Sequence, residues 1–193
     1  MTPTGATRRI FVALWPDDAV RARLAGVGAE WFAQGAPHSV APRLVPAGNL
    51  HLTLAFIGAC SESCLHDVAG AADRCARQHQ EVTLTLDHGA WFRRPRVGWL
   101  GPRKWPRALD CMVADLRSDL DQRGVAHSAG PFRPHVTLAR KVSHRPPQAG
   151  SAPITWVARD IGVVESVSTP EGVRYQLLSH HLLQINTRGA NTV

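Results

Sequence analysis

The stretch His51-Leu52-Thr53-Leu54 recurs as His135-Val136-Thr137-Leu138, and the two copies lie about half the chain apart. Apolar residues alternate with other residues in both copies, which is typical of a β-strand that buries one face. Residues two apart on a strand share a face, so each histidine lies beside its own threonine while the apolar residues point into a core. We therefore expect two similar lobes, each contributing one motif strand to a shared cleft.

Two imidazoles in one cleft can carry out acid–base chemistry without a metal. Because histidine titrates near neutral pH, one ring can accept a proton from a nucleophile while the other donates a proton to a leaving group. A threonine hydroxyl beside each ring can hydrogen-bond the non-bridging oxygens of a phosphate. A single His-x-Thr pattern is more often part of an ordinary strand, but its repetition in the same apolar frame favours a phosphodiester-cleaving site made of His51, Thr53, His135 and Thr137.

Four segments together resemble those of one known family. They are His51-Leu-Thr53-Leu, Pro131-Phe-Arg-Pro-His135-Val-Thr137-Leu-Ala-Arg140, Arg9-Ile-Phe11-Val-Ala13 and Pro95-Arg-Val97-Gly-Trp99-Leu-Gly101. In these segments the chain resembles the 2H phosphoesterases and, within them, the RNA 2′,3′-cyclic phosphodiesterases, also called 2′-5′ RNA ligases. The resemblance extends over nearly the whole chain.

The resemblance implies hydrolysis of a 2′,3′-cyclic phosphate at an RNA end to a 2′-phosphate. It implies that His51 is the proton donor and His135 the proton acceptor, roles that exchange in the reverse, ligating direction. Thr53 and Thr137 would bind phosphate oxygens and hold the imidazoles. The expected substrates are RNA ends or small cyclic nucleotides, and no cofactor or metal is expected.

The resemblance also implies that the positive charge of Arg140 binds the phosphate. Strict alternation places Arg140 on the face opposite His135 and Thr137, so it can reach the site only if the strand ends or bulges there. Arg133 is a further candidate for substrate binding, as part of a basic rim that follows the RNA backbone.

Several other functions are compatible with parts of the pattern. The same site could act as a 2′-5′ RNA ligase or a 2′-5′ phosphodiesterase. A non-catalytic RNA-binding protein is a third possibility, although intact histidines and threonines in both motifs argue against it. A metal-dependent phosphatase is disfavoured because no carboxylate accompanies either histidine, the nearest acids being Glu62 and Asp121.

Composition favours a polyanionic partner. The 193 residues carry a formal net charge of +7, which suits RNA, although an arginine-rich composition can arise without such a partner. No secretory signal or membrane-length apolar run is present, so we expect a monomeric cytoplasmic protein with no membrane partner. We also expect its four cysteines to be reduced, because their spacing does not suggest a zinc site. They are Cys60, Cys64, Cys75 and Cys111.

The order of expected elements predicts an α+β fold. It is bilobal, with two mainly antiparallel sheets and flanking helices forming a central cleft. Helices are expected over about 17–32, 61–78 and 106–123, and residues 81–92 are expected to form one strand that turns at Arg93-Arg94-Pro95 into a second. Residues 8–185 form a single domain in this interpretation, with flexible tails at 1–7 and 186–193.

Overall fold

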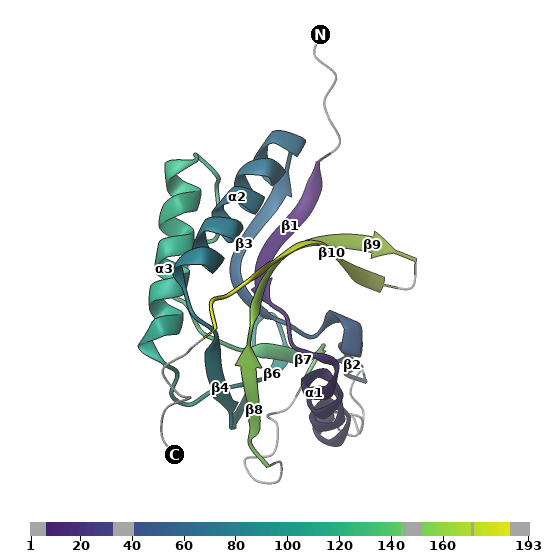
Figure 1. The fold of residues 1–193 in the computed structure, drawn as a ribbon. Helices are drawn as coiled ribbons and strands as arrows, with labels where there is room; N and C mark the ends of the chain where they lie inside the picture. The colour runs from purple at the N-terminus through teal and green to yellow at the C-terminus, as the bar shows by residue number, and fades with distance from the viewer. Residues whose placement is uncertain (1–6, 33–40, 144, 146–151, 171, 186–193) are drawn as a thin grey trace, which may run out of the picture.

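The computed structural model describes residues 7–32, 41–143, 145, 152–170 and 172–185, and the flexible tails expected at either end fall almost wholly outside these ranges. Figure 1 shows the helices gathered around a long, curved sheet. In chain order the elements are β1 (Arg8–Leu14), α1 (Asp18–Phe32), β2 (Arg43–Leu44), the 3₁₀ turn η1 (Ala47–Asn49), β3 (Leu52–Cys60), α2 (Glu62–Gln78), β4 (Val82–Leu86), β5 (His88–Phe92), β6 (Val97–Gly101), α3 (Arg107–Gln122), β7 (Val136–Arg140), β8 (Ile154–Ala158), β9 (Asp160–Thr169) and β10 (Gly172–Leu182).

The main sheet runs in the order β10-β9-β1-β3-β7-β6-β5, with β2 also paired to β7, and β4 and β8 form a separate two-stranded sheet. The pairs between these strands are antiparallel throughout the described residues. The α+β class and the mainly antiparallel pairing are therefore confirmed. The larger sheet contains both motif strands, so it runs continuously through both halves of the molecule.

The two halves of the sheet join where β3 meets β7. Leu52 pairs with Val136 there, and no other residue pair is recorded between these two strands in the described part of the chain. Both side chains are fully buried, so the junction is anchored in the core. Beyond this pair the strands separate: β3 continues against β1, and β7 continues against β6.

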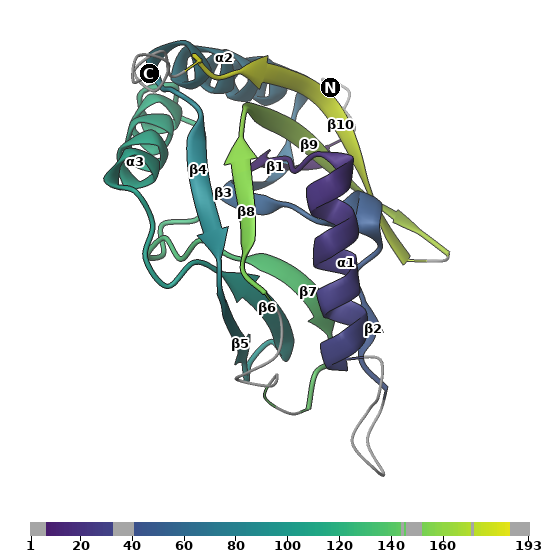
Figure 2. The same ribbon diagram turned by 60° about the horizontal axis from the view of Figure 1, so that its bottom comes forward.

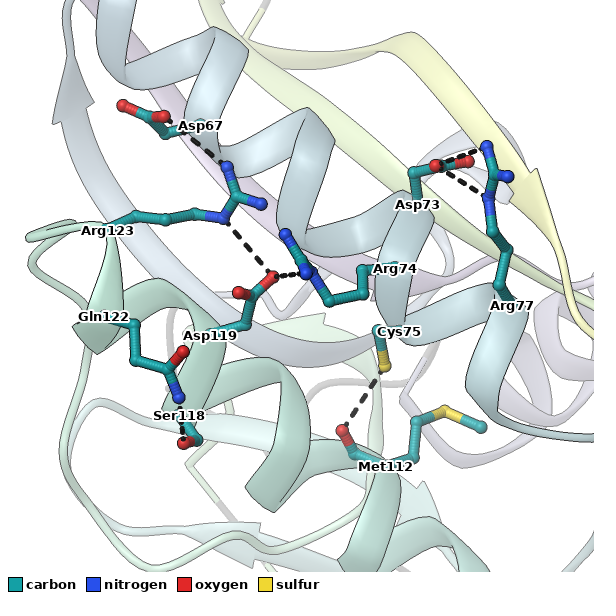
Figure 3. Close-up of polar contacts among 10 residues, drawn as sticks. All are labelled: Asp67, Asp73, Arg74, Cys75, Arg77, Met112, Ser118, Asp119, Gln122 and Arg123. Atoms are coloured by element: carbon teal, nitrogen blue, oxygen red, sulfur yellow. Dashed lines mark hydrogen bonds and ion pairs between the residues drawn. The ribbon is translucent and has the colours of Figure 1, made fainter.

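The helices cover the two halves separately (Figure 2). Helix α1 begins where the Asp17 carboxylate accepts a hydrogen bond from the Val20 amide, and it packs along β7 and β8. Helix α2 packs on β3, β9 and β10 and against α3. Figure 3 shows the ion pairs at the contact of α2 with α3. Asp119 of α3 accepts from Arg74 of α2, and Arg123 at the end of α3 pairs with both Asp119 and Asp67 of α2.

One expected strand is in fact two. Residues 81–92 were predicted to run as a single strand, but the structure divides them at Asp87 into β4 and β5, which belong to different sheets. The Asp87 amide donates to the carbonyl of Gly101, and its carboxylate accepts from the amide of Arg103. Asp87 therefore bonds to the segment that ends β6, and the chain changes sheets there. The expected turn after Phe92 is correct, because β5 and β6 pair as a hairpin.

The expectation of four reduced cysteines is also wrong in this structure. Cys60 and Cys64 form a disulfide across the turn between β3 and α2, with their Cα atoms 5.5 Å apart. The Ser61 hydroxyl between them accepts from the Cys64 amide and caps α2, which places the two cysteines one helical turn apart. Cys75 and Cys111 are free thiols. Within the described ranges, the helices are all too short or too polar to cross a membrane.

Gly98 on β6 lies against Phe32 of α1, so a substitution at this position tests how tightly α1 packs on the sheet. A methyl group at this position would overlap the end of the Phe32 ring, which is fully buried. We expect Gly98→Ala to lower the free energy of unfolding by about 1–3 kcal/mol, the usual cost of overpacking, as measured by urea denaturation. Gly26→Ala is the matched control: it lies on exposed α1 surface with no heavy atom within 4 Å and should stabilise the protein by up to about 1 kcal/mol. Equal stability of the two variants would contradict this packing.

Candidate active site

The four motif residues lie together around the Leu52–Val136 pair. In an antiparallel register this pair places position 51 alongside 137 and position 53 alongside 135. Leu52 and Val136 point into the core, so the histidines and threonines occupy the opposite face, where all four are partly exposed. We call this side of the sheet the motif face. The two His-x-Thr pairs, which are far apart in the sequence, therefore lie side by side on the sheet.

The two imidazoles are held in the same way. Nδ1 of His51 lies 2.7 Å from the carbonyl oxygen of Asn49, and Nδ1 of His135 lies 2.7 Å from that of Arg133. A carbonyl oxygen can only accept, so each Nδ1 carries a proton and donates it. In the neutral ring this leaves Nε2 as the proton acceptor. For His51, Nε2 lies 3.1 Å from the hydroxyl of Thr53, which donates to it while the ring is neutral.

Burial makes both imidazoles hard to protonate in the protein alone. The pKa of His51 is lowered from 6.5 to about 4, first by loss of solvent and then by the positive charges of His135 and Arg140, while the Asn49 carbonyl opposes the shift. The pKa of His135 is also lowered, mainly by burial and against the effect of the Arg133 carbonyl. Burial therefore favours the neutral form of both rings.

Aromatic rings surround His51. The ring centroid of Phe11 lies 4.7 Å from that of His51, the Trp15 ring is nearly parallel at 5.8 Å, and the Tyr175 ring meets it edge-on at 5.1 Å. These residues come from β1, the segment after it and β10. Distant parts of the chain thus remove water from His51, which is the physical cause of its lowered pKa.

A second aromatic group surrounds His135. Phe92 meets this ring edge-on at 5.3 Å, and Trp99 lies at 5.8 Å. Trp99 pairs across strands with Thr137, so it shares the motif face. The Trp99 side chain is partly exposed and contacts His135. A tryptophan in an alternating strand can face either way, and only the pairing of β6 with β7 decides which.

Arg140 reaches the motif face through a β-bulge. The register between β6 and β7 shifts by one residue between Gly98 and Trp99, so β7 carries one extra residue there. Trp99 and Val97 share a face of β6, and Arg140 pairs with Val97, so the shift returns Arg140 to the side of His135. Its effect on the pKa of His51 places its charge near that ring. Arg140 was expected to reach the site only if the strand ended or bulged, and the structure contains this bulge.

Two other arginines lie at the edge of this group. Arg43 of β2 pairs directly with Arg140, so both side chains share a face, and sequence reasoning missed Arg43 because β2 is only two residues long. Arg133 has an exposed side chain and contributes its backbone carbonyl to His135. The described residues contain no group of three or more His, Cys, Asp or Glu side chains arranged to hold a metal ion.

The fold and this site define a class of protein: a phosphoesterase with two His-x-Thr pairs on one antiparallel sheet. The family model described as the 2′-5′ RNA ligase superfamily matches residues 16–162, and the chain belongs to that family. The 2H phosphoesterase assignment made from the motifs is confirmed.

Individual relatives agree with the family assignment. The chain is 43% identical over 106 residues to the RNA 2′,3′-cyclic phosphodiesterase of Escherichia coli (strain K12), an alignment that covers 53% of this chain and 57% of that protein. It is 29% identical over 140 residues to the protein of the same name from Thermotoga maritima, covering 67% and 73% of the two chains. The crystal structure of E. coli LigT in apo form matches 92% of this chain and 98% of that chain, with a TM-score of 0.77 and 31% identity.

The lowered pKa of His51 predicts a pH-dependent stability. Between pH 6.5 and about 4 the unfolded chain binds a proton at this ring that the folded chain does not, so stability falls as the pH decreases through that window. We expect His51→Gln to remove up to about 3 kcal/mol of that loss, seen as a flatter curve of unfolding free energy against pH in urea titrations. His66→Gln, an exposed substitution on α2, serves as the reference. If the His51→Gln curve parallels that of the wild type, His51 is not desolvated.

Proposed function

We propose that this protein hydrolyses the 2′,3′-cyclic phosphate at RNA ends to a 2′-phosphate, using His51 and His135 as a proton-transferring pair. The observation that carries the proposal is the convergence of the two His-x-Thr pairs at Leu52–Val136, each with Nδ1 fixed on a backbone carbonyl and Nε2 left for proton transfer. The names of the E. coli and T. maritima relatives support the same reaction and an RNA substrate.

The reaction requires two proton transfers on opposite sides of one phosphorus. Nε2 of His135 takes a proton from water as the water oxygen bonds to phosphorus. The bond between phosphorus and O3′ breaks, and O3′ receives the proton carried by Nε2 of His51. The products are a 2′-phosphate and a free 3′-hydroxyl, and each histidine ends in the state in which the other began. The next turnover requires both protons to exchange with solvent.

Substrate binding supplies the charge that makes His51 an acid. In the protein alone its pKa of about 4 leaves the ring neutral, because burial and nearby positive charges disfavour its protonation. A bound phosphate is negative, so it raises the pKa of any ring that it contacts. In this proposal the substrate phosphate therefore promotes protonation of His51, the proton donor.

Thr53, Thr137 and Arg140 stabilise the phosphate in this proposal. The Thr53 hydroxyl already bonds to Nε2 of His51, so this hydroxyl lies within reach of a phosphate oxygen bound beside the same nitrogen. Arg140 carries a permanent charge to the same face, and guanidinium groups bind phosphate oxygens through two parallel hydrogen bonds. Arg43 and Arg133 extend the positive charge along the RNA backbone.

A second activity uses the same atoms. When a 5′-hydroxyl takes the place of water, its oxygen bonds to the phosphorus of the cyclic phosphate as the bond to O3′ breaks, which leaves a 2′-5′ linkage. The two histidines exchange roles when the 3′-hydroxyl cleaves that linkage back to the cyclic phosphate. The description of the matching family as a 2′-5′ RNA ligase superfamily supports this alternative. Because both histidines come from one chain, the site is complete in a monomer, and we infer that the protein acts as a monomer on RNA ends in the cytoplasm.

The catalytic roles can be tested with cyclic-phosphate-ended oligonucleotides in excess chelator. We expect the wild type to produce the 2′-phosphate and His51→Ala or His135→Ala to lower kcat by at least about 100-fold, since each removes one proton-transfer group. Unchanged circular dichroism would verify folding. A 3′-phosphate product, loss of wild-type activity in chelator, or activity retained in either variant would refute the proposal.

The role of Arg140 has its own test. We expect Arg140→Gln to lower kcat/KM by roughly 10- to 100-fold, with KM raised, because a hydrogen bond to a charged group contributes about 1.5–3 kcal/mol. Arg77→Gln removes the same charge from the other side of the sheet, where Arg77 pairs with Asp73 on α2, and should leave both constants unchanged (Figure 3). An equal effect of the two substitutions would show that only net charge matters.

A further inference from the structure

Asn49 makes two side-chain hydrogen bonds to β10. Its Nδ2 donates to the carbonyl of Val173 at 2.7 Å, and its Oδ1 accepts from the amide of Tyr175 at 3.1 Å. A side-chain amide thereby satisfies one acceptor and one donor of β10, as a neighbouring strand would. These bonds join positions 124 and 126 residues apart in the chain, so they tie the turn before β3 to the hairpin at the other end of the sequence.

Both partners in this clamp contact His51. The backbone carbonyl of Asn49 accepts the Nδ1 proton of His51, and the ring of Tyr175 meets the imidazole edge-on. Tyr175 also packs edge-on against Phe11, with ring centroids 4.9 Å apart, and Phe11 contacts the same imidazole. The Asn49 side chain therefore fixes the carbonyl that anchors His51 relative to a ring that packs on it.

The other histidine is held by a different arrangement. The carbonyl that anchors His135 belongs to Arg133, whose side chain is exposed and is of a kind that carries no acceptor. The carbonyl anchors are thus equivalent in the two motifs, whereas the double hydrogen bond to a distant strand is recorded for the Asn49 side alone among the described residues. This difference indicates a requirement particular to His51.

We propose that Asn49 is a positioning residue for His51, holding its imidazole in the Nδ1–H tautomer with Nε2 aimed at the substrate through a clamp on β10. The proposal rests on the proposed function, in which His51 exchanges a proton with O3′. A ring that turns away, or takes the other tautomer, cannot make that transfer. Small displacements of a reacting group cost up to about 100-fold in rate.

The test compares Asn49→Ala with the wild type by kinetics and by NMR. We expect Asn49→Ala to lower kcat by roughly 10- to 100-fold with KM changed less than about threefold, because substrate contacts stay in place while the proton transfer is misaligned. Long-range ¹H–¹⁵N spectra, with the His51 signals identified from their loss in His51→Ala, should show a mixture of tautomers in Asn49→Ala and the Nδ1–H form in the wild type.

Asn49→Asp adds a variant that keeps part of the clamp. The carboxylate still accepts from the Tyr175 amide but cannot donate to Val173, so kcat should fall between those of the wild type and Asn49→Ala.

Thr169→Val is the matched control. It removes the hydrogen bond from the Thr169 hydroxyl to the Gly172 carbonyl, which lies in the turn of the same hairpin but involves neither Asn49 nor His51. We expect kcat and the His51 tautomer to match the wild type. If Thr169→Val behaves like Asn49→Ala, general loosening of the hairpin explains both and the proposal is wrong.

The remaining outcomes separate this inference from the proposed function. An Asn49→Ala protein with wild-type kcat and an unchanged tautomer overturns the positioning role while leaving the catalytic role of His51 intact. Activity that survives in His51→Ala overturns the proposed function, and with it the reason for positioning. A tautomer change without a change in kcat shows that Asn49 orients a ring that the reaction does not need, which also overturns the proposal.

Discussion

The site depends on a single buried contact between two strands. Leu52 and Val136 are fully buried opposite one another, and they form the one registered residue pair between β3 and β7 in the part of the chain that the structure describes. Because side chains alternate along a strand, the burial of these two residues forces the histidines and threonines on either side of them to the opposite face. A slip of one residue in either strand would turn one motif into the core. The hydrophobic effect at the junction therefore sets the geometry of a polar site.

The environment of the histidines lowers their affinity for protons while it keeps them in place. Five aromatic side chains contact the two rings: Phe11, Trp15, Tyr175, Phe92 and Trp99. The water that they displace would otherwise stabilise an imidazolium, so the pKa values fall. The lowered pKa values suit a site that binds anions. A phosphate entering a poorly hydrated, positively charged group is attracted more strongly than it would be in water, and its charge restores the protonation that burial opposes.

The sequence predicted the parts of this structure that depend on local pattern. The helices follow from apolar spacing and polar caps, and the pairing of imidazole with hydroxyl follows from alternation within each motif. The aromatic surroundings could not be predicted, because Tyr175 reaches His51 only through the order of strands in the sheet. The break at Asp87 was missed because alternation continues on both sides of it, and only the bonds to Gly101 and Arg103 reveal the change of sheet. For Arg140, alternation gave the wrong face until the bulge was seen.

A reaction that needs one acid and one base sets a problem for a site built from two copies of one motif. The carbonyl anchors give both rings the same tautomer and the same 2.7 Å bond, so they cannot distinguish the two roles. The distinction has to come from what lies beyond the motifs. Arg140 lies outside the two His-x-Thr pairs, and its positive charge acts to lower the pKa of His51. The clamp from Asn49 to β10 acts on the first histidine only. The two carbonyl anchors are thus alike, and under the proposed mechanism the separate roles of the two histidines would come from residues outside these anchors, such as Arg140 and Asn49.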